Sequence, residues 1–179
     1  MEHQLGFSAV ETIWAKQSFE QMALDNGVII QSYFTDSGAF KANAFVTQIR
    51  NHEQHIRYCV NNAHHKNGIA EHSIQSVSNM SCAMILYASA HWKEGIDATL
   101  WPTAVKYATH LYNHLPNNQG LCPADLFTGS TIPRHRLCDL HIWGCPVYIL
   151  DPQLQGGQKL PRWQPRSRRG VFLGLSSFH

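Results

Sequence analysis

The feature that most constrains the fold of this chain is an alternation of helix-type and strand-type patterns along its first part. A Ser-x-x-Glu capping box at Ser8 opens a helical pattern over residues 8–27, which closes at Asn-Gly, a left-handed stop signal. The β-branched and aromatic run at 28–35 predicts a buried strand ending at Asp-Ser-Gly. Helical spacing of apolar residues predicts a short helix at 43–50, and a second strand is expected at 55–60.

Two longer helices are predicted further along. Residues 69–90 contain no Gly or Pro and many small or apolar side chains. Residues 101–115 carry apolar side chains at steps of three or four, with Pro102 tolerated in the first turn. The inward stripe of the longer helix is expected to be Ile74, Val77, Ser81, Met84, Ile85 and Ala88.

Short β-like runs follow at 141–143, 147–150 and 171–173. The order predicts an α/β layer domain followed by a small β module. A length of 179 residues fits one domain, or one domain with a small module.

Composition excludes several classes of protein. A hydrophobic fraction of 44% with only 15% charged residues is not that of a disordered polyelectrolyte. No window approaches the roughly 18 consecutive apolar residues of a membrane span, and the first residues lack the order of a secretory signal, so an intracellular protein without a membrane partner is expected. The five cysteines form no Cys-x-x-Cys pair, which disfavours a disulfide framework or a zinc ribbon.

The formal net charge of +2 conceals a gradient along the chain. Residues 1–151 hold all twelve acids against nine bases, a charge of −3, whereas residues 152–179 carry +5. Such a basic end favours an anionic partner, and nucleic acid is the usual one inside cells. Trp163 lies among the cations and could stack on a base, whereas the alternative is an exposed turn whose arginines are simply solvated. The cations are Lys159, Arg162, Arg166, Arg168 and Arg169.

Two carboxylates have positions typical of a site. Asp36 ends the first predicted strand and Glu71 lies in the first turn of the long helix, and open α/β sheets build sites where strand ends face helix starts. Converging carboxylates suit Mg²⁺ or Mn²⁺, and a metal pair can activate water in phosphodiester chemistry. Each acid also has a structural explanation, since Asp favours turns and Glu favours a helix N-terminus.

The sequence around these two acids resembles that of a known protein family. Residues 33–40 (Tyr-Phe-Thr-Asp-Ser-Gly-Ala-Phe) and 67–71 (Asn-Gly-Ile-Ala-Glu) are similar to the motifs of the second and third acids in the Asp-Asp-Glu integrase core of retroelements, especially copia-type long-terminal-repeat retrotransposons. Further similar motifs follow in the family's order, at residues 100–105, 112–116, 123–129, 140–148 and 166–174.

The resemblance implies a ribonuclease-H-like integrase core at 1–132, followed by a partial SH3-like β-barrel at 133–179. It implies DNA integration by polynucleotidyl transfer, in which water cuts the element's DNA end and the new 3′ hydroxyl attacks target DNA. Asp36 and Glu71 would then be catalytic residues and hold Mg²⁺ or Mn²⁺. Element ends and target DNA would be the partners, with a homo-oligomer as a candidate assembly and the nucleus as the location.

Departures from the family pattern argue against activity of the chain alone. The family's first acid lies on an opening strand, but only residues 1–6 precede the first helix here, so the first strands and the first Asp are expected to be missing. Ser37 replaces the usual Asn, and His72 stands where a basic residue commonly follows the Glu. We therefore expect little or no strand transfer. The alternatives are a non-catalytic nucleic-acid-binding remnant and a chain that does not fold stably.

Two histidine-containing segments are further candidates. The predicted loop before the long helix could contact DNA phosphate or a metal-bound water, or it could be only a solvated loop. His110 and His114, four residues apart, could bind zinc with a third ligand, but no Glu follows His110 to complete the metalloprotease pattern. The residues of that loop are His64, His65, Lys66 and Asn67.

Overall fold

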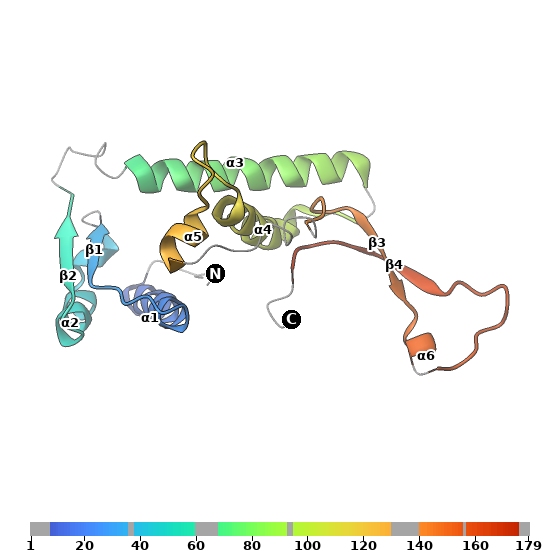
Figure 1. Ribbon diagram of the computed structural model, residues 1–179, viewed down its shortest axis with the longest axis horizontal. Helices are drawn as coiled ribbons and strands as arrows, with labels where there is room; N and C mark the ends of the chain where they lie inside the picture. The colour runs from blue at the N-terminus through green and yellow to red at the C-terminus, as the bar shows by residue number, and fades with distance from the viewer. Residues whose placement is uncertain are drawn as a thin grey trace. The chain divides into compact units, whose positions relative to one another are not determined.

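The chain has a mixed α/β structure in the computed structural model (Figure 1). It divides into two compact units, and each is discontinuous in sequence. The expected division into residues 1–132 and 133–179 stays a prediction, because compact units need not coincide with inherited domains. The described residues are 8–35, 38–59, 68–92, 95–129, 140–155 and 157–175. Unit 1 comprises Met1–Gln75 with Pro116–Ile132, and unit 2 comprises Ser76–Leu115 with Pro133–His179.

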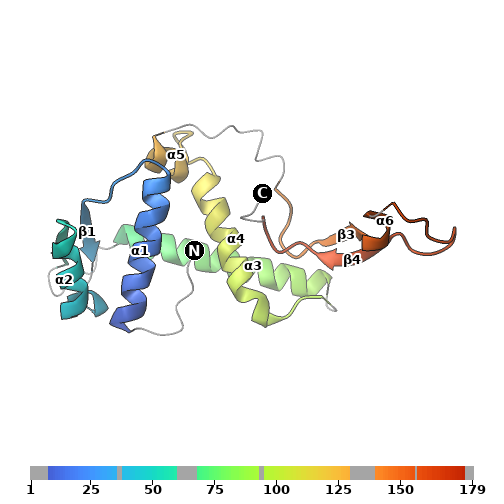
Figure 2. The ribbon, with the colours of Figure 1, turned by 90° about the horizontal axis from the view of Figure 1, so that it is seen from below.

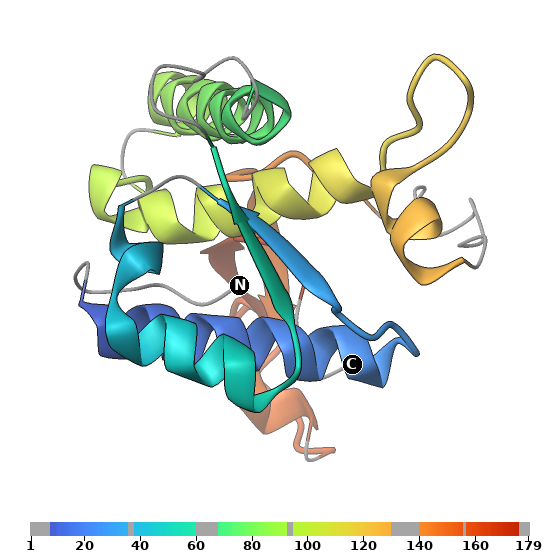
Figure 3. The same cartoon turned by 90° about the vertical axis from the view of Figure 1, so that its left-hand side faces the viewer.

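Unit 1 contains a pair of parallel strands with two helices on one face. Helices α1 and α2 lie side by side against the pair formed by β1 and β2 (Figure 3). Alternate strand residues are half-buried and exposed, as expected for strands covered on one face. The elements are α1 (Ala9–Asp25), β1 (Ser32–Thr35), the 3-10 helix η1 (Ala39–Lys41), α2 (Asn43–Asn51), β2 (His55–Tyr58) and the short helix α5 (Pro123–Thr128).

Local signals in the sequence predicted helices α1 and α2 of unit 1, but not the short helix α5. The Ser8 hydroxyl accepts a hydrogen bond from the Glu11 backbone N–H at 3.3 Å, which confirms the predicted N-cap of α1. Helix α2 is confirmed as well, with Phe45 and Ile49 each only 1% exposed. Phe45 contacts Phe40 edge-on with 5.3 Å between the ring centroids, so α2 packs on η1.

The first strand is shorter and less buried than predicted. Residues 28–31 are not in β1, because the Val28 N–H donates to the Ala23 carbonyl at 2.9 Å and stays with the end of α1. Among the described residues, β1 pairs only with β2. The two strands are parallel, with Ser32 opposite His55 and Thr35 opposite Tyr58. Among the described residues of unit 1, α1 and α2 cover one face of this pair, and the side chain of Phe34 remains 51% exposed.

Unit 2 is built on two helices and a β-hairpin. The hairpin projects from the helices in Figure 2. Helix α3 begins in unit 1 and its larger part belongs to unit 2. No helix in the described part of the chain is long and apolar enough to span a membrane. The elements are α3 (Gly68–His91), η3 (Ala98–Leu100), α4 (Trp101–His114), β3 (Pro146–Leu150), α6 (Pro152–Gln155) and β4 (Ser167–Val171).

The core of unit 2 lies where α3, α4 and the start of the hairpin meet. Its buried residues are Ala88 of α3, Ala104 and Tyr107 of α4, and Trp143. Ala88 and Ala104 contribute small side chains to this cluster beside the Trp143 indole ring. The Tyr107 hydroxyl donates to the His141 carbonyl at 2.6 Å, which fixes α4 to the segment before β3.

The predicted apolar stripe of α3 is only partly correct. Ser81 and Ala88 are buried, and Met84 and Ile85 pack against the core of unit 2. Ile74 was predicted to face inward but is 67% exposed. Periodicity identifies one face of a helix, but another element must cover that face before it is buried.

Two predicted β-runs near the C-terminus are wrong. Residues 141–143 form no strand, because Trp143 lies in a turn and inserts into the core with 1% exposure. The run at 171–173 was also predicted to be a strand, but the observed strand β4 is the more basic segment Ser167–Val171. Hydrogen bonding with β3 decides which residues pair, and the Phe172 N–H instead donates to the Cys145 carbonyl at 2.9 Å.

Candidate nucleic-acid interface

The two predicted metal-binding carboxylates are not both within the described structure. Glu71 is exposed in the first turn of α3, as predicted. Strand β1 ends at Thr35, and Asp36 is next in sequence but lies outside the described residues. Their pairing therefore stays a prediction, as does the binding of Mg²⁺ or Mn²⁺. Within the described ranges, no group of three or more His, Cys, Asp or Glu side chains is arranged to hold a metal ion.

The predicted phosphate-binding loop before α3 also lies outside the described residues. Its residues are His64, His65, Lys66 and Asn67.

The predicted basic segment is described, and it forms one side of a hairpin. We call residues 146–171, which comprise β3, α6, β4 and the segment between α6 and β4, the basic hairpin. All six predicted nucleic-acid-binding side chains of this hairpin are exposed, and Trp163 is 92% exposed. The guanidinium of Arg162 lies 6.0 Å from the centre of the Trp163 indole ring. The six are Lys159, Arg162, Trp163, Arg166, Arg168 and Arg169.

The register of the hairpin separates its two strand arginines. Arg169 pairs with Tyr148 and Arg168 with Ile149, so the two guanidinium groups leave opposite faces of the ribbon. The Arg168 Nε atom lies 3.2 Å from a carboxylate oxygen of Asp151. A backbone hydrogen bond from Gln153, and then the contact with Arg168, hold the pKa of Asp151 below its ordinary value.

This arrangement suits an extended polyanion. Asp151 is the last acid of the chain, so it is the only carboxylate in the hairpin that can compete with phosphate for the five cations. Exposed guanidinium groups can bind phosphate oxygens bidentately, and an exposed indole offers a face for base stacking. A simple solvated turn would also leave these cationic side chains exposed. A DNA-binding segment and a solvated turn therefore differ only in whether the hairpin binds DNA.

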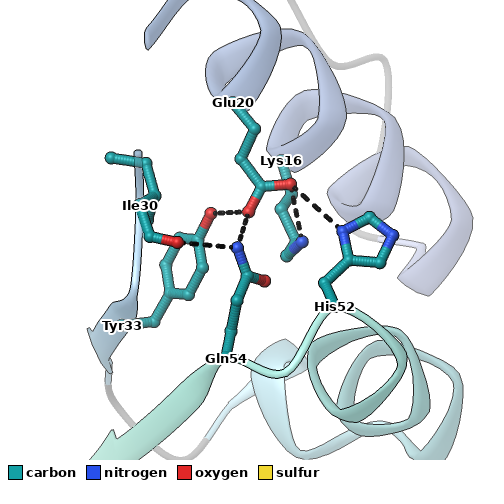
Figure 4. Close-up of polar contacts among 6 residues, drawn as sticks. All are labelled: Lys16, Glu20, Ile30, Tyr33, His52 and Gln54. Atoms are coloured by element: carbon teal, nitrogen blue, oxygen red, sulfur yellow. Dashed lines mark hydrogen bonds and ion pairs between the residues drawn. The ribbon is translucent and has the colours of Figure 1, made fainter. Parts of the chain in front are cut away.

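A polar network in unit 1 was not found from the sequence. The carboxylate of Glu20 joins α1 to β1 and to the residues between α2 and β2 (Figure 4). One of its oxygens accepts hydrogen bonds from the Tyr33 hydroxyl and the Gln54 amide, each at 2.5 Å. The other lies 2.8 Å from the Lys16 ammonium and 3.8 Å from Nδ1 of His52. The spacing of Lys16 and Glu20 could have indicated the ion pair, but no local signal indicates the other partners.

The electrostatics of this network favour the ionised carboxyl. Burial opposes ionisation of Glu20, but hydrogen bonds from Lys16, Tyr33 and Gln54 outweigh it and hold the pKa of Glu20 below its ordinary value. Burial and the neighbouring carboxylate both raise the pKa of Tyr33. The ammonium of Lys16, whose side chain is 2% exposed, would repel a metal cation. We therefore assign this network to stability.

The His110 and His114 pair does not form a zinc site with the described residues. Their rings stack at 4.1 Å, and Nδ1 of His114 contacts the His110 carbonyl at 2.7 Å. Burial, together with the neighbouring His114, lowers the pKa of His110. No third ligand completes a metal-binding group with them in the described part of the chain.

Comparison with known proteins adds no further assignment. No protein-family model and no curated protein sequence matches the chain. The resemblance to copia-type integrases therefore rests on the sequence motifs alone. The exposed cations of the basic hairpin are the independent structural observation that bears on function.

Proposed function

We propose that this chain is an integrase-like protein of a copia-type retrotransposon and that, by itself, it binds nucleic-acid backbone through the basic hairpin. The observation that carries the binding proposal is the exposure of five cations on one hairpin that has a single competing carboxylate, Asp151. The motif resemblance supports the family, and with it a ribonuclease-H-like core and an SH3-like module. Binding to chromosomal DNA would take place in the nucleus. A homo-oligomer is part of the same proposal, and light scattering tests it.

The physical basis for binding is the release of counterions from DNA. Each phosphate that a Lys or Arg neutralises frees condensed cations, so affinity falls steeply as salt concentration rises. Arg168 must give up its ion pair with Asp151 to bind phosphate, so its net contribution to the free energy of DNA binding is smaller. Lys159, Arg162, Arg166 and Arg169 do not face that competition from Asp151 in the described structure.

We expect duplex DNA binding with a strong salt dependence that the hairpin sets. Replacing Arg162 and Arg166 together by glutamine should reduce the slope of log affinity against log salt by about 2, because each lost phosphate contact removes about 0.9. Fluorescence anisotropy with a labelled duplex at several salt concentrations measures this slope. The matched control replaces Arg50 and Arg57, which are exposed cations of unit 1. An equal loss of slope in the control would assign the binding to net charge alone.

We expect no strand transfer from this chain alone. Only two residues, Asp36 and Glu71, match the three acids of the family motif, and a bridging carboxylate is needed to position two metal ions. A DNA-end cleavage assay with Mg²⁺ or Mn²⁺ should give no product above that of the Asp36→Asn variant. Robust metal-dependent cleavage that Asp36→Asn abolishes would overturn this expectation.

A non-catalytic nucleic-acid-binding remnant is the second candidate function. The favouring observation is that the five exposed Lys and Arg side chains of the basic hairpin include neither of the two candidate catalytic acids, so backbone binding by them requires no metal site. DNA binding that neither Mg²⁺ nor Asp36→Asn changes would support the remnant. A chain that does not fold would instead show no cooperative thermal unfolding.

A further inference from the structure

A pocket of about 620 Å³ lies within unit 2, between the end of α3 and the basic hairpin. Its volume is in the range of small-ligand sites. His91 and Trp92 line one side of it, and Pro146 and Arg169 belong to the hairpin side. All the residues that line it belong to unit 2.

The wall of the pocket on α3 is aromatic and held in place. The His91 ring stacks on Tyr87 with 4.1 Å between centroids and an angle of 27° between planes. Its Nδ1 atom lies 2.8 Å from the Tyr87 carbonyl, which fixes the ring on the last turn of the helix. Trp92 follows with its ring 5.8 Å from that of His91, and it packs against the core of unit 2. Rings fixed in this way lose little entropy when a flat ligand stacks on them.

The hairpin wall supplies a positive charge. Arg169 extends from β4 on the same face of the ribbon as Pro146. No carboxylate is among the described lining residues. Gly95 keeps part of the lining small, and a Cβ atom at that position would lie 3.1 Å from a methyl group of Val171. The pocket thus combines aromatic rings with a guanidinium group.

We propose that this pocket binds one nucleotide of a single-stranded nucleic acid, with the base stacked on His91 and the phosphate bound by Arg169. The Trp92 ring, tilted by 47° from that of His91, would contact the edge of the base. The proposal rests on the backbone binding assigned to the hairpin and adds a base-binding subsite to it. Stacking needs an unpaired base, so a duplex does not use the pocket. Every base has a flat face, so binding by stacking tolerates any sequence.

The test compares two labelled single strands with the same number of phosphates. One is an oligothymidylate of about ten nucleotides, within the range of known single-strand binding sites, and the other is its abasic counterpart. We expect the full chain to bind the oligothymidylate about five-fold or more tightly, the effect of one stacked base. His91→Ala should reduce this preference to what stacking on Trp163 contributes, and it should leave the affinity for the abasic strand unchanged.

Controls distinguish base binding in the pocket from backbone binding by the hairpin and from loss of structure. His91 is exposed on the last turn of α3, and circular dichroism should show unchanged helix content in His91→Ala. His55→Ala replaces an exposed histidine that does not line the pocket, and it should keep the full preference. Equal affinity of the wild-type chain for both strands, or a preference that His91→Ala does not reduce, overturns the pocket proposal while backbone binding stands. Binding to neither strand at low salt overturns both proposals.

Discussion

Replacing Glu20 by glutamine is expected to lower the free energy of unfolding by about 2 kcal/mol, because it leaves the Lys16 ammonium buried without its counter-charge. A neutral amide also cannot accept the hydrogen bonds of Tyr33 and Gln54 as strongly as a carboxylate does. The cost stays below that of a fully buried pair, because the Glu20 side chain retains 16% exposure. Urea unfolding followed by circular dichroism measures the change.

The matched control for this variant lies on the same helix. Asp25→Asn removes a negative charge from α1, but Asp25 is exposed and accepts its hydrogen bond from the exposed Gln21. We expect a change within about 0.5 kcal/mol. Similar losses from both substitutions would show that net charge on α1, and not the buried network, sets the stability.

The stability that the Glu20 network contributes should also depend on pH. The pKa of Glu20 is lowered in the folded chain, so its contribution is full above the ordinary Glu value of about 4.3 and declines as pH falls below it. The pKa of Tyr33 is raised, so its contribution is full below its ordinary value of about 10 and declines above it. The difference in stability between the wild type and Glu20→Gln should therefore shrink in acid. A constant difference down to about pH 3 would contradict the interaction.

Replacing Gly144 by alanine is expected to destabilise unit 2 by about 3 kcal/mol, through steric overlap and backbone strain together. The new Cβ atom would overlap the Cβ atom of Ala88 in α3 and lie 3.4 Å from the terminal methyl of Ile96. Gly144 also has φ of 81°, in the left-handed region that an L-residue rarely adopts. Its N–H donates to the Phe172 carbonyl at 2.8 Å, so the backbone cannot shift without losing that bond.

A second glycine of unit 2 separates the two causes. Gly157 has φ of 76°, close to that of Gly144, but a Cβ atom there would meet nothing within 4 Å. Gly157→Ala should therefore cost only the strain of the left-handed conformation, about 1 kcal/mol. Thermal unfolding of both variants measures the difference. Equal losses would mean that the close approach of Gly144 to α3 contributes nothing.

Local signals in the sequence predicted most helices of this chain. The Ser8 cap, the spacing of Phe45 and Ile49, and the absence of Gly and Pro from 69–90 all act within a few turns. Pairing of strands was predicted less well, since the basic β4 forms a strand while the apolar run at 141–143 does not. A strand depends on a partner that is distant in sequence, and local composition does not specify that partner.

The candidate sites also differ in whether local sequence could predict them. Exposure of the basic segment followed from its charge, because five cations cannot be buried without partners. The pocket could not be predicted, because His91 of α3 and Arg169 of β4 are 78 positions apart in sequence and line one pocket only in the folded chain. Glu20 has partners 13 and 34 residues away, in Tyr33 and Gln54.

The sequence by itself determined where the four longer helices lie and which end of the chain is positively charged, but it did not indicate the short helices α5 and α6. These properties depend on backbone hydrogen bonds between near neighbours and on formal charge, and both are local. Tertiary structure alone decided that Ile74 is exposed, that Trp143 is buried and that Lys16 has a buried counter-charge. The reason is that burial and ion pairing depend on which distant surface covers a residue, and that surface exists only once the chain has folded.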